Sequence, residues 1–263
     1  SGLLEMNLDL LKFRIRTSIT AVIKFCIHLL GSIFVSPFIR IGRPASLSKN
    51  RSEVRILYIC LAFRGDLILN FPAILALKKE LPKSKITCWV REYNKRLGAL
   101  SGNIDTVISY DGFENTGIRM LKDLAGIKKH NRFISFLREK EFDICIDDSG
   151  HAFSTMVCFL AGIPFRVGRN GQGFGFLYHY EYPYGFNESL TRKKLRLLEP
   201  LRIFVEKIDE FFPTIQVSQD QLKMVMEKCG LEFGKSRYFT IQPFGGWEAK
   251  SWGIEKFAYV IDS

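Results

Sequence analysis

The fold of this chain is decided by residues 56–72, which read ILYICLAFRGDLILNFP. The stretch continues an apolar run that extends from Val54 to Ala62 and is interrupted only by Arg55. Both faces of such a strand are hydrophobic, which is typical of a strand covered on both sides in a parallel sheet. The sequence therefore predicts a first, central strand here.

The apolar run ends at Phe63, and a helical pattern follows from Leu67 to Leu81. Between them, Gly65 is expected to allow a tight turn or a close backbone approach, and Asp66 occupies the position expected for the N-cap of the helix. Asp66 is thus predicted at the carboxyl end of a strand, the edge of open α/β sheets where ligands bind. The alternative is that Asp66 only caps its helix.

Strands and helices are predicted to alternate along the rest of the chain, which favours an α/β fold with a mostly parallel sheet. Further strand patterns cover Ile86–Arg91, Thr106–Tyr110, Phe142–Asp147, Phe165–Gly168 and Tyr238–Gln242. Helical patterns cover Tyr93–Leu100, Ile118–Lys140, Ala152–Ala161, Asn187–Phe204, Gln219–Cys229 and Ile254–Ile261. We expect a helical extension with a linker at residues 1–50, one Rossmann-like domain at 51–212, and the beginning of a second at 213–263.

The chain is strongly basic, with a net charge of +11 over 263 residues. This charge predicts attraction to anions such as nucleic acid, an anionic membrane surface or phosphorylated substrates, and does not choose among them. No two of the six cysteines have metal-ligand or redox spacing. Cys60 and Cys145 lie in apolar strand patterns and are predicted to be buried thiols in a reducing compartment.

Residues 17–38 carry a single formal charge, Lys24, and are flanked by arginines on both sides. The segment is long enough to span a bilayer, but Lys24, His28, Gly31 and Pro37 weaken that interpretation. An interfacial amphipathic helix, with its basic residues toward anionic lipid, is an equal alternative. A third interpretation is a helix packed on the following domain. No small-residue cleavage site of a signal peptide follows the apolar core.

Three blocks in order resemble the ADP-heptose:lipopolysaccharide heptosyltransferases, glycosyltransferase family 9, over about residues 54–263. The first contains Arg64-Gly65-Asp66 and Phe71-Pro72-Ala73. The second contains Phe142–Asp147 and Ala161–Gly168. The third runs from Gln242 to Trp252 and contains a Lys-x-Trp motif. Two positions depart from the family pattern: Phe244 follows Pro243 where glycine is usual, and Gly253 stands where proline is usual.

The resemblance implies a GT-B architecture of two Rossmann-like domains, and inversion at the anomeric centre without a metal or another cofactor. It implies that Asp66 is the general base, that Lys250 contacts the phosphates of an ADP-sugar donor, and that Gly245 and Gly246 line the same site. A carboxylate suits this role because a sugar hydroxyl must lose its proton as it attacks. Without the resemblance, Lys250 would be interpreted as a surface lysine.

Four residues are candidates for binding an anionic lipid-linked saccharide acceptor: Arg64, His151, Arg166 and Arg169. Guanidinium groups suit phosphates and carboxylates, and His151 follows the strand that ends at Asp147. For His151 the alternative is a capping residue or a partner of Asp148. For each arginine singly, a solvated surface role is the alternative. Asp147 and Asp148 are not interpreted as a metal pair, because no third ligand has suitable spacing.

The resemblance predicts transfer of heptose or a related sugar at the cytoplasmic face of the inner membrane of a Gram-negative-type bacterium, with membrane contact through residues 1–43. The family's donor-site motif would lie after Ser263, so we expect the chain to be a fragment that is inactive alone. One alternative is a nicotinamide-dependent Rossmann oxidoreductase, which requires a Gly-x-Gly-x-x-Gly motif where only Gly65 is present. Another is a non-catalytic membrane-surface binding module.

Overall fold

The computed structural model describes residues 21–33, 35, 53–110, 124–182, 187–207, 210–211, 215–242 and 252–262. The chain divides into two compact units, Ser1–Gln216 and Val217–Ser263, which we describe separately. The linker predicted up to residue 50 lies outside the described residues.

The first unit is built on a six-stranded parallel sheet with the order β3-β2-β1-β4-β5-β6. The strands are β1 Arg55–Cys60, β2 Lys85–Val90, β3 Thr106–Ser109, β4 Ile144–Asp147, β5 Phe165–Arg169 and β6 Tyr180–Tyr182. The predicted α/β class with a parallel sheet is confirmed. The short strand β6 was not predicted, because its three residues lie within a loop rich in glycine and aromatic residues.

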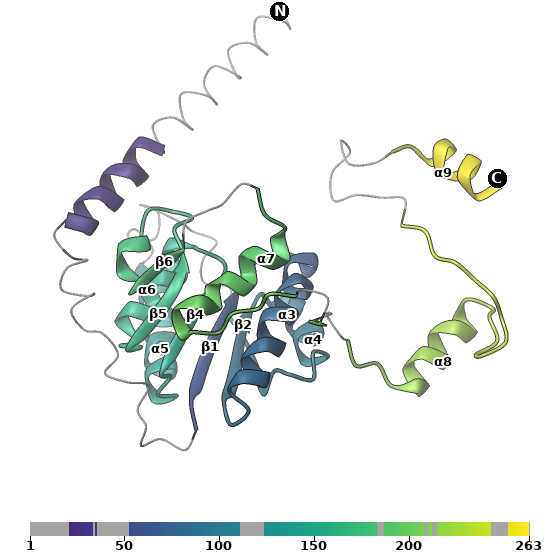
Figure 1. Cartoon of the computed structure of the whole chain (residues 1–263), viewed down its shortest axis with the longest axis horizontal. Coiled ribbons are helices and arrows are strands. Elements are labelled where there is room, and N and C mark those ends of the chain that lie inside the picture. The colour runs from purple at the N-terminus through teal and green to yellow at the C-terminus, as the bar shows by residue number, and fades with distance from the viewer. Residues whose placement is uncertain are drawn as a thin grey trace, which may run out of the picture. The chain divides into compact units, whose positions relative to one another are not determined.

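Helices cover both faces of the sheet (Figure 1). The α-helices of the first unit after β1 are α3 Arg64–Glu80, α4 Lys95–Ala99, α5 Leu124–Glu139, α6 Ala152–Leu160 and α7 Leu190–Leu195, and the 3-10 helices are η1 Glu92–Asn94, η3 Gly175–Leu177 and η4 Arg196–Leu201. The helix predicted over Asn187–Phe204 is therefore shorter and continues as a 3-10 helix. It ends at Arg202, which has a left-handed φ of 63°.

Alternate residues of β1 enter two hydrophobic cores, as expected for a strand buried on both faces. Ile56, Tyr58 and Cys60 pack with α3 and η4 on one face. Leu57 and Ile59 pack with α5 and α6 on the other. The apolar sequence of β1 thus accounts for its central place in the sheet. As a result, the residues after Cys60 lie at the carboxyl end of the sheet, between β2 and β4.

The second unit contains α8 Gln219–Lys228 and α9 Ile254–Asp262. Helix α8 begins with a capping box in which the Ser218 side chain accepts from the Gln221 backbone and the Gln221 side chain accepts from the Ser218 backbone. The strand predicted over Tyr238–Gln242 is wrong, because these residues form no β-ladder within the described part of the unit. A strand pattern becomes a strand only where a neighbouring strand supplies hydrogen-bond partners.

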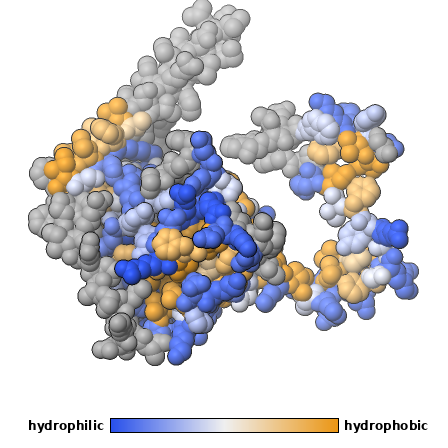
Figure 2. Space-filling model, in the orientation of Figure 1, coloured by the Kyte–Doolittle hydropathy of each residue, from blue (hydrophilic) through white to orange (hydrophobic). Residues whose placement is uncertain are grey.

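Residues 21–33 form a helix that buries its more polar face and exposes its apolar face, the opposite of a usual surface helix. Its apolar residues face outward: Val22, Ile23, Phe25, Leu29, Leu30 and Ile33 are all exposed. Lys24, His28 and Gly31 are on the partly or fully buried side. Figure 2 shows hydrophobic side chains along this helix, which is purple in Figure 1. Among the described residues, no helix is both long and apolar enough to cross a membrane.

Candidate functional site

Asp66 lies in the first turn of α3, immediately after the carboxyl end of β1. The prediction that Asp66 is the N-cap was wrong: the helix begins at Arg64 and Phe63 is the N-cap, without a side-chain capping bond. Gly65 was expected to serve a tight turn, but it is a helical residue with open space around its Cβ position. Asp66 is half-buried, and a carboxylate in the first turn is stabilised by the helix dipole.

Side chains from the neighbouring strands hold the turn that precedes Asp66. Arg91 Nε, just after β2, donates to the Leu61 carbonyl at 2.7 Å, and Asn94 Nδ2 donates to the Ala62 carbonyl at 2.9 Å. From the β4 side, the Leu61 N–H donates to Ser149 Oγ at 2.6 Å. These hydrogen bonds therefore fix the start of α3 from the β2 side and from the β4 side. A functional site needs such rigid support to hold its side chains in place.

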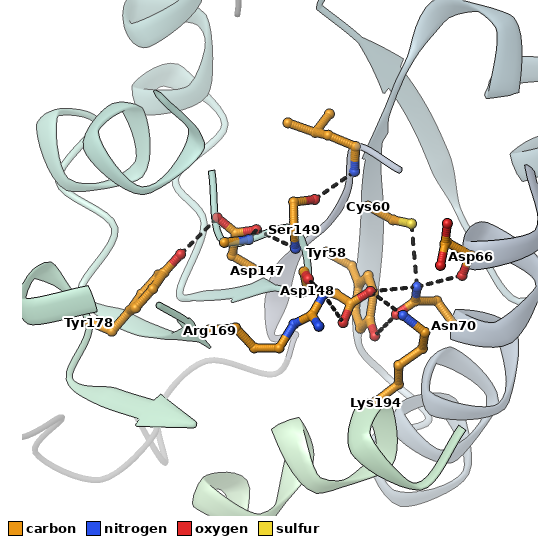
Figure 3. A network of polar contacts seen from close by, with 12 residues as sticks. Tyr58, Cys60, Asp66, Asn70, Asp147, Asp148, Ser149, Arg169, Tyr178 and Lys194 are labelled. Carbon is orange, nitrogen blue, oxygen red and sulfur yellow. Dashed lines mark hydrogen bonds and ion pairs between the residues drawn. The ribbon is translucent and has the colours of Figure 1, made fainter. Parts of the chain in front are cut away.

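A buried polar cluster around Asp148 joins the carboxyl ends of β1 and β4 (Figure 3). Asp148 is only 2% exposed. Its carboxylate pairs with Lys194 Nζ at 2.5 Å and with Arg169 Nη2 at 3.0 Å, and it accepts from Asn70 Nδ2 at 2.9 Å. Opposite charges at such distances satisfy a carboxylate that would otherwise be costly to bury.

Asn70 connects this cluster to Asp66. Its Nδ2 also donates to the Asp66 main-chain carbonyl at 2.8 Å, and its Oδ1 accepts from Tyr58 OH at 2.6 Å. Burial, with Asp148 as the next contribution, raises the pKa of the nearby Cys60 thiol to about 12. The thiol therefore stays neutral, and the charges of the cluster are those of Asp148, Arg169 and Lys194.

Asp147 organises the loop after β4. It is fully buried, and its carboxylate accepts from the backbone N–H groups of Ser149 and Gly150 at 2.9 and 3.2 Å and from Ser154 Oγ and Tyr178 OH at 2.6 and 2.9 Å. Burial raises the pKa of Asp147, and these hydrogen bonds oppose the rise. Asp147 therefore shapes the loop that carries His151.

His151 is the N-cap residue of α6 and lies at the carboxyl edge of the sheet, as predicted from the sequence. Its Nδ1 is 3.1 Å from Gln172 Nε2. Burial lowers the pKa of His151; Asp147 opposes this, and the positive charges of Arg91 and Lys24 add to it. The imidazole is therefore neutral at neutral pH.

The three candidate arginines have different environments. Arg64 is exposed, with its guanidinium carbon 5.8 Å from the centroid of the Tyr93 ring. Arg169 is held by Asp148. Arg166 contradicts the prediction of an acceptor-binding side chain: it is 5% exposed, and it donates to the carbonyls of Leu177, at 3.0 Å, and Ile163. Its guanidinium therefore stabilises the fold.

The predicted donor-binding residues Gly245, Gly246 and Lys250 lie outside the described residues. No group of three or more His, Cys, Asp or Glu side chains that could hold a metal occurs in the described part of the chain. Metal independence remains a prediction.

Sequence reasoning missed Asn70 and Lys194, which complete the polar cluster. Asn70 could have been noticed as the one polar residue in the otherwise apolar run from Leu67 to Leu77. Lys194 belongs to a basic run, in which nothing distinguishes a buried lysine from a solvated one. Only the packing of α7 against α3 brings its ammonium group to Asp148.

His179 predicts a pH dependence of stability. Burial and the charge of Arg166 lower the pKa of His179 to about 4, and its Nδ1 accepts from the Arg166 N–H at 3.2 Å. Because the unfolded imidazole titrates near pH 6.5, the unfolded state binds more protons than the folded state between about pH 4 and pH 6.5. Stability therefore falls as pH decreases from about 6.5 towards 4.

The variant His179→Asn keeps a hydrogen-bond acceptor without this titration. We expect the urea midpoint to fall less between pH 7 and pH 5 in His179→Asn than in the wild type; an equal fall would contradict the assignment.

Comparison with known proteins gives the family. The model of glycosyltransferase family 9 (heptosyltransferase) matches residues 130–263, about half of the chain. Lipopolysaccharide heptosyltransferase 3 of Escherichia coli (strain K12) is 26% identical over 209 residues, which cover 76% of this chain and 57% of that protein. A second E. coli lipopolysaccharide heptosyltransferase 3 is 24% identical and is covered over 58% of its length. This chain therefore spans less than two thirds of these relatives.

Solved structures give the same fold. The glycosyl transferase family 9 protein from Veillonella parvula DSM 2008 matches with a TM-score of 0.64 and 20% identity, over 80% of this chain and 59% of that one. E. coli heptosyltransferase WaaC with ADP-2-deoxy-2-fluoro heptose matches with a TM-score of 0.57 and 16% identity, over 80% of this chain and 65% of that one. The family predicted from the three sequence blocks is confirmed: this chain belongs to glycosyltransferase family 9 (heptosyltransferase).

Proposed function

We propose that the protein transfers heptose or a related sugar from an ADP-sugar to a lipid-linked acceptor of the lipopolysaccharide-core type, with inversion and without a metal or other cofactor. The observation that carries this proposal is the position of Asp66. Its half-buried carboxylate follows β1, at the point where the order β3-β2-β1-β4-β5-β6 changes direction. Ligands of open α/β sheets bind at this switch point.

Asp66 is proposed as the general base. The acceptor hydroxyl is a weak nucleophile, and a fixed carboxylate accepts its proton as the glycosidic bond forms. The restrained turn before Asp66 supports this role, because catalysis requires the base to be held in position before the substrate arrives. Gly65, the residue before Asp66, has open space where a Cβ would lie.

Arg64, His151 and Arg169 are proposed to contact the acceptor. Arg64 is exposed beside Asp66, and His151 and Arg169 follow β4 and end β5 at the same edge of the sheet. An anionic acceptor would be attracted by the exposed Arg64 and by the net charge of +11, whereas the neutral His151 would contribute hydrogen bonds. Arg166 is left out because its side chain is buried in the fold.

The donor is proposed to bind through Lys250, Gly245 and Gly246, in a GT-B arrangement of two Rossmann-like domains. The proposed domains are residues 51–212 for the acceptor and a second domain that begins at about residue 213. The relative E. coli WaaC was solved with ADP and with an ADP-heptose analogue, which supports an ADP-sugar donor. A cation and backbone N–H groups would stabilise the charge that develops on the leaving phosphates.

The protein is proposed to work at the cytoplasmic face of the inner membrane of a Gram-negative bacterium, with residues 1–43 in contact with the bilayer surface. Two observations support this location. The helix at 21–33 exposes its apolar residues, and arginines precede and follow it in the sequence at positions 14, 16, 40 and 43. Apolar side chains beside basic residues are typical of interfacial helices on anionic lipid.

A nucleotide-binding assay and a sugar-transfer assay separate this proposal from the oxidoreductase alternative. Tryptophan fluorescence of the full-length protein is expected to change saturably with ADP and not with NADH, and radiolabelled sugar is expected to pass from ADP-heptose to a core-saccharide acceptor. Saturable binding of NADH, without a response to ADP and without transfer, would overturn the proposal. Membrane binding without binding of either nucleotide would favour a non-catalytic module.

A further inference from the structure

The helix at residues 21–33 packs on the loop between β5 and β6, not on a hydrophobic core. Gly31 is buried, and a Cβ at this position would overlap the ring of Phe176. A Cβ on Gly173 would lie 2.7 Å from the carbonyl oxygen of Lys24. His28 Nε2 is 3.7 Å from Glu181 Oε2. Two glycines thus allow a close backbone approach that larger residues would prevent.

The same loop reaches the candidate acceptor site. Gln172 contacts His151 Nδ1 through its Nε2 at 3.1 Å, and its Oε1 accepts from the Ala152 N–H at 3.1 Å. Further along, Tyr178 OH donates to the buried Asp147. The effect of Lys24 on the pKa of His151 agrees with this proximity. The inner face of the helix is therefore in contact with the loop that positions His151.

The outer face of the helix is apolar, and no other described part of the chain buries it. Val22, Phe25, Leu29 and Ile33 are spaced for one helical face, and each is between 45% and 64% exposed. Exposed apolar faces of this kind mark surfaces that bind protein or lipid. Arginines near both ends of the helix in the sequence, and the net charge of +11, favour anionic lipid.

We propose that this helix is a docked membrane-contact element, which binds anionic lipid through its outer face and, through Gly31 and Gly173, holds the acceptor-binding edge of the sheet at the bilayer surface. The inference rests on the proposed function for its acceptor and goes beyond it in one respect. A flexible tether would only concentrate the enzyme at the membrane, whereas a docked helix also fixes the orientation of His151 and Asp66 towards the lipid-linked saccharide. Fixed orientation raises the effective concentration of the acceptor at the site.

Two variants of the full-length protein separate the two faces. Phe25→Glu/Leu29→Glu places charges on the outer face, and Gly31→Leu prevents docking of the inner face against Phe176. Ala21→Leu is the matched control, because it introduces the same residue, with three added carbons instead of four, at an exposed position of the same helix. Binding is measured by flotation with vesicles of phosphatidylcholine and phosphatidylglycerol, and docking by hydrogen–deuterium exchange of residues 173–181.

The expected results differ for each variant. Phe25→Glu/Leu29→Glu loses flotation, and Ala21→Leu behaves like the wild type in all assays. Gly31→Leu still floats but exchanges faster at residues 173–181. Its transfer to acceptor embedded in vesicles falls about tenfold or more, whereas transfer to the same saccharide without its lipid falls less.

Each contrary result is decisive. Flotation of Phe25→Glu/Leu29→Glu at the wild-type level would overturn lipid contact by the outer face. Unchanged exchange in Gly31→Leu would overturn the docking, and undiminished transfer in vesicles would overturn the orienting role. A wild-type protein that transfers no sugar to the lipid-free saccharide would instead overturn the proposed function, and flotation and exchange would still decide where the helix binds.

Discussion

Asp66→Asn is expected to lower the rate of sugar transfer by at least about 10²-fold in the full-length protein. Asparagine has nearly the same size and can accept hydrogen bonds, but its amide cannot take the proton of the acceptor hydroxyl. The main-chain carbonyl of residue 66 still accepts from Asn70, so the start of α3 is preserved. Initial rates with ADP-heptose and a core-saccharide acceptor measure the effect on kcat.

The control for Asp66→Asn is Asp220→Asn, which removes the same charge from the first turn of another helix, α8, at an exposed position. We expect this variant to keep the wild-type rate. Circular dichroism of both variants checks that the fold is intact. A near wild-type rate for Asp66→Asn would exclude Asp66 from the chemistry, and an equal loss in Asp220→Asn would show that the assay reports on charge or folding and not on the base.

Asp148→Asn is expected to lower the free energy of unfolding of the first unit by about 3–5 kcal/mol, which is typical of removing one member of a buried ion pair. The loss arises because Lys194 and Arg169 would remain close together with no carboxylate between them. Their contacts with Asp148 are 2.5 and 3.0 Å, and the Lys194 and Asp148 side chains are 5% and 3% exposed. Urea denaturation monitored by circular dichroism measures the change.

Two further variants test the origin of this loss. Glu141→Gln removes a carboxylate from an exposed pair with Arg55, at 3.5 Å, in the same unit, and is expected to cost less than about 1 kcal/mol. The double variant Asp148→Asn/Lys194→Met removes the uncompensated ammonium and is expected to be more stable than Asp148→Asn alone. A cost for Asp148→Asn that is no larger than that of Glu141→Gln would contradict a buried, charge-paired cluster.

The predicted strands of the first unit show what local pattern can determine. The runs at residues 56–60 in β1 and 144–146 in β4 are apolar on both faces, so a parallel, doubly covered sheet was predictable from composition and periodicity. The carboxyl-end location of Asp66 and His151 followed from the same patterns. The strand predicted at Tyr238–Gln242 was wrong, and β6 was missed, because short strands depend on a neighbouring strand more than on their own residues.

The roles of individual polar residues could not be predicted in this way. Arg166 and Arg169 are only three positions apart in the sequence, yet Arg166 is buried against backbone carbonyls and Arg169 pairs with Asp148. Asn70 and Lys194 come from distant parts of the chain and both reach Asp148 because α7 packs against α3. No local pattern records a contact between residues so far apart in sequence.

The sequence by itself determined the family, the parallel α/β class and the placement of Asp66 at the edge of the sheet, because strand burial and turn residues are local properties. Only the tertiary structure decided that Asp148 pairs with the buried Lys194 and the partly buried Arg169, and that the helix at 21–33 turns its apolar face outward. These features depend on which surfaces meet: the glycines at 31 and 173 permit a close approach by the polar side of the helix, and its hydrophobic side stays exposed.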